Sequence, residues 1–223
     1  MTTKLFIQAL TKFLAGLVLV GLLLFLPAGT WAYWQAWLFI AILFIPMFIA
    51  GMWLMIASPE LLRKRLSAKE EQGEQKWVVA LSSLLFLATF VLAGLNIRFG
   101  WWFMPDSVTY VAAVLFLIGY TLYAEVMREN VWLSRTVEVQ ENQQVVDTGL
   151  YGIVRHPMYS ATLIIFLTMP LVLNSIWSFA LMLLYIPIIV KRIRNEETVL
   201  ERNLAGYTEY KKRVRYRLIP FIW

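Results

Sequence analysis

Two polar clusters contain the residue types that could position a reaction. The chain's one histidine lies in the segment Arg155-His156-Pro157-Met158-Tyr159, between a hydrophilic stretch and a long apolar run. Where that run ends, Arg192 precedes the acidic pair Glu196 and Glu197. An apolar run that folds back on itself as a membrane hairpin brings its two ends to one membrane face. We therefore expect imidazole, phenol, guanidinium and carboxylate groups to meet there.

Arg192 and Glu196 are four residues apart, so on a helix they share one face and can pair across it. A guanidinium can bind a carboxylate through two parallel hydrogen bonds, so Arg192 could hold a reactant that carries a carboxylate. A carboxylate is already ionised at neutral pH and needs no base to react as a nucleophile, whereas an amine must lose a proton, and Glu197 or His156 is then the candidate base. Arg192 and Glu197 are thus the candidate catalytic residues, and both kinds of reactant stay open.

The composition is that of a polytopic membrane protein. Of the 223 residues, 60% are hydrophobic and 15% are charged, and the mean hydropathy is +0.66. With one histidine and no cysteine, we expect no protein-built metal site. The net charge of +6 comes from Lys and Arg residues beside apolar segments, where a positive-inside bias accounts for them. We therefore expect no nucleic-acid partner.

Four apolar segments are long enough to cross a membrane, which takes about 20 helical residues. They cover residues 8–26, 34–57, 77–97 and 108–127. Basic residues crowd the polar stretches 58–76 and 128–157, which the positive-inside rule assigns to the cytoplasm. Both termini then face the cytoplasm, and we expect an integral protein of a microbial cytoplasmic membrane.

The apolar stretch 158–190 is too long for one helix and short for two, and Asn174 interrupts it. We predict a re-entrant or shallow hairpin of two half-length helices, with its tip buried near Asn174. The expected fold is all-α, with about five to six transmembrane helices that include this C-terminal hairpin. Residues 1–127 form helices 1–4 with the basic loop 58–76. Residues 128–223 form a cytoplasmic catalytic region made of the loop 128–157, the hairpin 158–190, and a helix and tail, 191–223.

The position of the polar groups bears on function. None of the predicted spans has a charged residue near its middle, and such residues are typical of ion-coupled transporters. A site at the membrane face can instead take one reactant from water and the other from the bilayer. That arrangement favours a lipid-modifying enzyme.

Ordered motifs add a family resemblance. Residues 145–151 read Val-Val-Asp-Thr-Gly-Leu-Tyr and precede the Arg-His-Pro-Met-Tyr segment. Three further motifs follow the hairpin: Arg192 with the acidic pair, Gly-Tyr-Thr-Glu-Tyr at residues 206–210, and Leu-Ile-Pro at residues 218–220. Over roughly residues 128–223 this pattern resembles the isoprenylcysteine carboxyl methyltransferase family and the related phospholipid methyltransferases. Leu150 stands where many members have proline.

The resemblance implies methyl transfer from S-adenosyl-L-methionine to a lipidic acceptor at the cytoplasmic membrane face, with a prenylcysteine-like carboxylate as the family's acceptor. Membrane lipids and a lipophilic or lipidated acceptor are the implied partners. Arg192 would face the acceptor. The implied cofactor-binding residues are Gln140, Val145, Val146, Tyr151, His156, Pro157, Met158, Tyr159 and Glu196.

Other readings of the same residues stay open. The acceptor could be a phospholipid amine, another amine or a thiol. Sterol reductases share a similar C-terminal pattern and would use NADPH, and a lipid-binding protein could keep the fold without turnover. His156 before Pro157 could simply begin a helix, and Glu196 with Glu197 could be ordinary acidic residues of a solvated helix.

Overall fold

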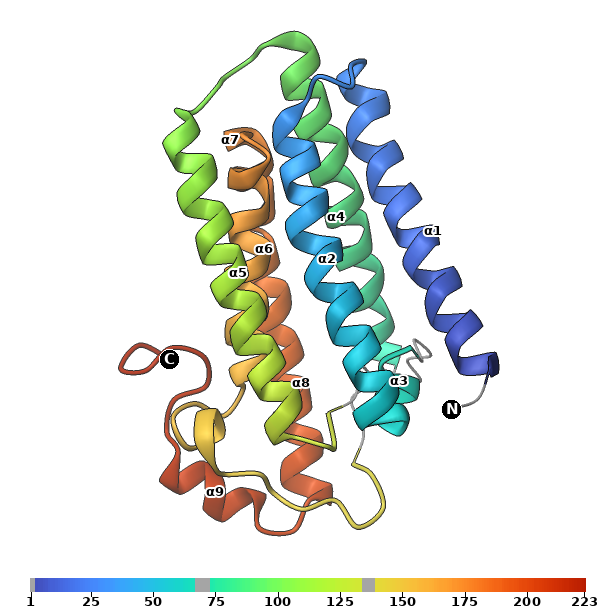
Figure 1. Cartoon of the computed structure of the whole chain (residues 1–223). Coiled ribbons are helices and arrows are strands. Elements are labelled where there is room, and N and C mark those ends of the chain that lie inside the picture. The colour runs from blue at the N-terminus through green and yellow to red at the C-terminus, as the bar shows by residue number, and fades with distance from the viewer. Residues whose placement is uncertain (1–2, 67–72, 134–138) are drawn as a thin grey trace.

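The chain folds into a bundle of long apolar helices with a polar region at one end (Figure 1). The computed structural model describes residues 3–66, 73–133 and 139–223, and in these ranges the regular secondary structure is helical throughout. The predicted spans correspond to α1 (Thr3–Ala28), α2 (Trp34–Ala57), α4 (Gly73–Phe99) and α5 (Asp106–Glu129). Each observed helix contains its predicted span, because apolar length determines a membrane helix.

Glycines let neighbouring helices approach closely. A Cβ atom added at Gly94 of α4 would lie 2.6 Å from the Leu24 carbonyl oxygen of α1, and one at Gly119 of α5 would lie 2.8 Å from Ile165. Ile165 belongs to α6 (Pro157–Val172), which packs along α5. Small residues at such crossings permit dense packing where lipid supplies no hydrophobic drive. Gly119 thereby fixes α6, and with it the first of the two polar clusters.

The predicted hairpin is present but reaches further than a shallow one. It consists of α6, α7 (Ile176–Met182) and α8 (Tyr185–Asn203). At its buried tip, the Asn174 side chain accepts from the Met104 amide (2.7 Å) and donates to the Met104 carbonyl (3.0 Å). Met104 lies in the connection between α4 and α5, at the end of the bundle remote from the N-terminus (Figure 1). The half-length prediction is wrong for the second half, because Ile176–Asn203 is long enough to cross a membrane, whereas α6 has 16 residues. Met104 and Asn96 supply hydrogen bonds at the turn.

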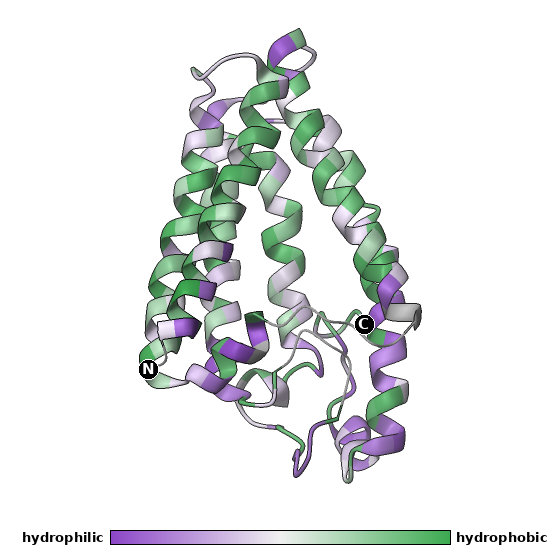
Figure 2. Cartoon of the chain, turned by 90° about the vertical axis from the view of Figure 1, so that its right-hand side faces the viewer, coloured by the Kyte–Doolittle hydropathy of each residue, from purple (hydrophilic) through white to green (hydrophobic). Residues whose placement is uncertain are grey.

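The polar elements gather at the other end of the molecule. There lie α3 (Pro59–Leu66), the 3-10 turn η1 (Gly149–Gly152), the polar C-terminal half of α8, and α9 (Tyr207–Arg213) (Figures 1 and 2). Five helices of the described residues are long and apolar enough to cross a membrane, the fifth running from Ile176 to Asn203 through the short break before α8. The protein is accordingly an integral membrane protein with one hydrophilic end.

Candidate active site

The first turn of α6 is held by the C-terminal tail. His156 is the residue before the helix and Pro157 occupies its first position, where a missing N–H costs nothing. The amides of Arg155 and His156 donate to the carbonyls of Tyr216 and Arg217, each at 2.9 Å. Residues some 60 positions apart in the chain are thus paired, and the orientation of the His156 side chain depends on the tail.

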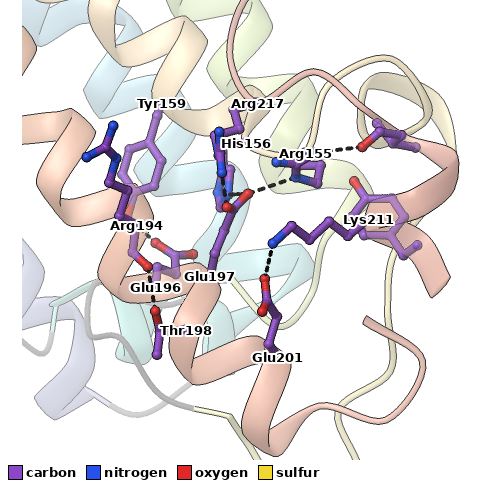
Figure 3. Close-up of polar contacts among 12 residues, drawn as sticks. Arg155, His156, Tyr159, Arg194, Glu196, Glu197, Thr198, Glu201, Lys211 and Arg217 are labelled. Atoms are coloured by element: carbon purple, nitrogen blue, oxygen red, sulfur yellow. Dashed lines mark hydrogen bonds and ion pairs between the residues drawn. The ribbon is translucent and has the colours of Figure 1, made fainter. Parts of the chain in front are cut away.

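Glu197 of α8 lies at the centre of a buried ion cluster (Figure 3). One carboxylate oxygen accepts from Arg155 Nε at 2.7 Å and lies 3.2 Å from His156 Nε2; the other accepts from Arg217 Nε at 2.9 Å. The Glu197 side chain is 4% exposed, so these donors replace water and keep the carboxylate ionised. We call these four residues the Glu197 cluster.

Arg155 connects the cluster to the tail a second time. Its Nη1 donates to the carbonyls of Val214 and Arg215, both at 2.8 Å. The guanidinium therefore serves a carboxylate on one side and main-chain carbonyls on the other, and its planar donor fork suits this arrangement. A lysine in its place could not hold both groups in the same geometry.

A second chain of polar side chains runs beside the cluster. Arg192 Nε donates to the Tyr159 hydroxyl at 2.9 Å, and that hydroxyl donates to Glu196 Oε2 at 2.5 Å. The expected proximity of Arg192 and Glu196 on one face of α8 is present, with a phenol of α6 bridging them. Arg192, Tyr159 and Glu196 all line the same cavity, so a molecule bound there would meet all three side chains.

The loop before α6 is shaped by a glycine and a carboxylate. Gly149 has φ +49°, and a Cβ there would lie 1.4 Å from Glu129 Oε1. The other oxygen of Glu129 accepts from the Leu150 amide at 3.1 Å. This contact positions Tyr151, whose hydroxyl accepts from Asn130 Nδ2 at 2.9 Å. Only a residue without a side chain fits at 149, because the position combines a left-handed φ with this close approach.

The aromatic side chains of the polar end are neutral hydrogen-bonding groups. The Tyr210 hydroxyl of α9 donates to the Tyr151 carbonyl at 2.7 Å. Burial raises the pKa of Tyr151 and of Tyr210 well above the ordinary value for a phenol. Burial, with the nearby carboxylates of Glu197 and Glu196, does the same to the pKa of Tyr207. The Tyr207 hydroxyl is buried and has no hydrogen-bond partner among the described residues.

These elements enclose a cavity at the polar end, with about 840 Å³ of unfilled space that is partly open to solvent. Eight of the eleven predicted site residues line it: Val145, Val146, Tyr151, His156, Met158, Tyr159, Arg192 and Glu196.

Three predicted residues are outside the cavity lining. Gln140 donates its amide to the Trp132 carbonyl at 2.6 Å, and Trp132 does line the cavity. Pro157 is buried in the first turn of α6. Glu197 is buried in its ion cluster. Each therefore supports a neighbour that faces the cavity.

Several lining residues were absent from the predicted site. They are Asn130, Trp132, Leu133, Gln143, Gln144, Arg155, Tyr207 and Tyr210, together with apolar residues of α8 and the turn after it. Arg155 stands inside the Arg-His-Pro motif, so its place in that motif was an available signal. No sequence pattern pointed to the tail residue Arg217, because its contact with Glu197 spans 20 residues of chain and depends on how the tail folds back.

The donor set suits an organic cofactor. Among the described residues no group of three or more His, Asp or Glu side chains is arranged to hold a metal ion. The cavity instead combines a carboxylate acceptor at Glu196, the His156 imidazole, apolar side chains such as Val145 and Leu200, and the unpartnered hydroxyl of Tyr207. A buried hydroxyl without a partner costs free energy unless a ligand supplies one. These groups fit a molecule with an ammonium, hydroxyls and a flat heterocycle.

Comparisons with known proteins agree with the fold and the family resemblance. Residues 107–206 match the family described as phospholipid methyltransferase. The structure of a eukaryotic intramembrane Ras methyltransferase, isoprenylcysteine carboxyl methyltransferase, has a similar fold: the TM-score is 0.50 and the identity 18%, over 84% of this chain and 75% of that one. The predicted resemblance to the phospholipid methyltransferases and to isoprenylcysteine carboxyl methyltransferase is confirmed.

A partial likeness to a reductase also exists. Over 91 residues, 40% of this chain, the sequence is 32% identical to the Delta(14)-sterol reductase of Mus musculus. The match covers 22% of that protein, so the chain spans about a fifth of its length.

Proposed function

We propose that this chain, whose residues 107–206 match the phospholipid methyltransferases and whose fold is that of a membrane methyltransferase, transfers a methyl group from S-adenosyl-L-methionine to a lipidic acceptor. The observation that carries the proposal is the cavity at the polar end, lined by His156, Tyr159, Arg192 and Glu196. By the positive-inside rule that end faces the cytoplasm. The cofactor then enters from water and the acceptor from the bilayer.

Residues of the chain can hold each part of the cofactor. Glu196 accepts hydrogen bonds from its ammonium or ribose hydroxyls, and the Tyr207 hydroxyl donates to an acceptor. Val145, Val146 and Tyr151 pack against its flat surfaces. When bound, S-adenosyl-L-methionine supplies a sulfonium methyl carbon that takes an electron pair from the acceptor and leaves a neutral thioether. The site's task is alignment and exclusion of water, which can supply about 7–11 kcal/mol of the barrier.

The surroundings of the candidate bases favour an acceptor that is already ionised. Glu197, which is outside the cavity lining, is held by the guanidiniums of Arg155 and Arg217, and His156 Nε2 is directed at Glu197. Both are committed to the buried cluster, so we assign Glu197 a positioning role in place of a base. Arg192 lines the cavity and can bind a carboxylate. A lipidic carboxylate, like the prenylcysteine carboxylate of the resembling family, is thus the favoured acceptor class.

The first test is binding of S-adenosylhomocysteine to the purified protein in detergent, measured by calorimetry. Glu196→Ala and His156→Ala each remove a charged or hydrogen-bonding side chain from the cavity lining. Both variants should bind S-adenosylhomocysteine at least about tenfold more weakly than wild type. Glu209→Ala removes an exposed carboxylate that pairs with Lys212, and this control should bind like wild type. Absence of binding to the wild-type protein would reject the proposal.

The acceptor is identified by incubation with labelled S-adenosyl-L-methionine and fractionated membrane lipids. A base-labile product indicates an ester formed on a carboxylate, whereas a base-stable product indicates methylation on nitrogen or sulfur. No label in any fraction would favour a lipid-binding protein without turnover.

The likeness to the Delta(14)-sterol reductase motivates one competing function, a membrane reductase that uses NADPH. The same purified protein is titrated with NADPH and with S-adenosylhomocysteine. Saturable binding of NADPH alone would replace the methyltransferase proposal with the reductase one.

A further inference from the structure

A second cavity lies in the membrane part of the molecule, away from the candidate active site. It is a groove between the N-terminal half of α1, the C-terminal half of α2, and α3. Phe6, Phe13, Phe48, Met52 and Leu62 are among its walls. It encloses about 690 Å³ of unfilled space, part of it open. An apolar groove that is open toward the bilayer can take a hydrocarbon chain.

One cationic side chain joins this apolar lining. Lys12 lines the groove, is exposed, and donates from Nζ to the Leu66 carbonyl at 2.6 Å. Leu66 is the last residue of α3, so the ammonium marks the rim at the polar end of the bundle. An ammonium has three donors, and one bond to a carbonyl leaves donors for an anion. Arg63 of α3 is also exposed at this end, where it forms an ion pair with Glu60, so Lys12 is the cation that the groove itself presents.

The groove and the candidate active site are separate, with no lining residue in common. One apolar cluster connects them through α3. Leu62 lines the groove and packs in one apolar cluster with Tyr151, which lines the active-site cavity. From the same helix, the Arg65 guanidinium lies 5.3 Å from the ring centre of Tyr123 on α5. A molecule in the groove therefore contacts α3 and does not reach the residues that line the candidate active site.

We propose that this groove binds an anionic phospholipid as a non-reacting ligand, with one acyl chain between α1 and α2 and its phosphate at Lys12. Charge complementarity selects the headgroup, because a basic rim at the membrane surface attracts anionic lipid. The apolar walls select the chain. Since Leu62 of α3 packs in the same apolar cluster as Tyr151 of the active-site wall, the bound lipid braces that cluster. This inference goes beyond the proposed methyl transfer and does not depend on it.

Two glycines provide a matched pair of variants. A Cβ added at Gly51, which lines the groove, or at Gly21 on α1, outside its lining, meets no heavy atom within 4 Å. Gly51→Leu therefore fills the groove without a clash at its Cβ, and Gly21→Leu adds the same side chain elsewhere. Both substitutions replace a helical glycine, so the gain in helix propensity is common to the two.

Binding of dioleoylphosphatidylglycerol to the purified full chain is measured by native mass spectrometry, with dioleoylphosphatidylcholine as the neutral competitor. Wild type and Gly21→Leu should retain the anionic lipid, and Gly51→Leu should bind it at least about tenfold more weakly. Lys12→Gln should lose about fivefold of the preference for the anionic lipid, and Lys12→Arg should keep it.

Equal lipid binding by Gly51→Leu and Gly21→Leu would overturn the proposal, as would equal affinity of the wild type for the two lipids. Unchanged phosphatidylglycerol binding with a raised KM for the methyl acceptor in Gly51→Leu would also overturn it, because the groove would then hold the acceptor. The lipid readout needs no cofactor. A failure of S-adenosylhomocysteine to bind therefore rejects the methyltransferase alone.

Discussion

At the residue scale, two adjacent glutamates have opposite surroundings. Successive residues on a helix point about 100° apart, so Glu196 lines the cavity while Glu197 points into the buried cluster. The sequence predicts that both lie near the site, but it does not separate their roles. That separation depends on Arg155 and Arg217, which lie 42 and 20 positions away along the chain.

The Glu197 cluster predicts a large cost for losing one charge. Glu197→Gln keeps the side-chain volume but leaves Arg155 buried without a counter-charge, so the free energy of unfolding should fall by about 3–5 kcal/mol. Thermal unfolding in detergent measures this change. The control Glu201→Gln, whose carboxylate pairs with Lys211 at the surface, should change it by no more than about 1 kcal/mol. Similar melting temperatures for the two variants would contradict a structural role of the cluster.

At the element scale, the spans are more predictable than the turns between them. A run of apolar residues specifies α1, α2, α4 and α5 because the bilayer requires their length. The depth of the hairpin depends instead on Met104 and Asn96, which satisfy the tip from other elements. The turn at Gly149 likewise depends on Glu129 at the end of α5. Contacts of this kind leave no periodic pattern in a sequence.

The turn at Gly149 can be tested with a double-mutant cycle. Gly149→Ala should lower the free energy of unfolding by more than about 2 kcal/mol, because a left-handed φ and a collision with Glu129 act together. In a Glu129→Ala background the collision is gone, and the cost should fall to about 1–2 kcal/mol of backbone strain. Denaturant titration measures the four proteins. Additive effects would mean that the carboxylate does not approach residue 149.

Alkaline pH should weaken the packing of α9 against η1, where Tyr210 donates to the Tyr151 carbonyl. Burial raises the pKa of Tyr151, Tyr207 and Tyr210 above the phenol value of 10.0. These groups favour the folded state below pH 10; above it the unfolded chain releases protons that the folded chain retains, so stability falls. Protease cleavage near residues 204–214, followed from pH 8 to 12, should accelerate above about pH 10. A pH-independent rate would contradict this coupling.

At the scale of the whole molecule, α1, α2, α4 and α5 each cross the membrane once, and the hairpin then returns the chain to the side from which it started. This topology predicts that both termini lie on the same side of the membrane. The sequence has no cysteine, so a single introduced thiol reports its own location. We expect a membrane-impermeant maleimide to label Ser107→Cys in intact cells, and Thr208→Cys only after permeabilisation. The reverse pattern would invert the proposed orientation.

The tail's contacts also have a consequence for the timing of synthesis. Residues 214–217 accept or donate the hydrogen bonds that hold Arg155, His156 and Glu197. A nascent chain that has emerged up to α8 carries its apolar helices, yet its central carboxylate still lacks one guanidinium. At about 5–20 residues per second, the interval from Glu197 to Arg217 lasts roughly one to four seconds. The Glu197 cluster is thus complete only after the tail has been synthesised and has folded back onto α6 and α8.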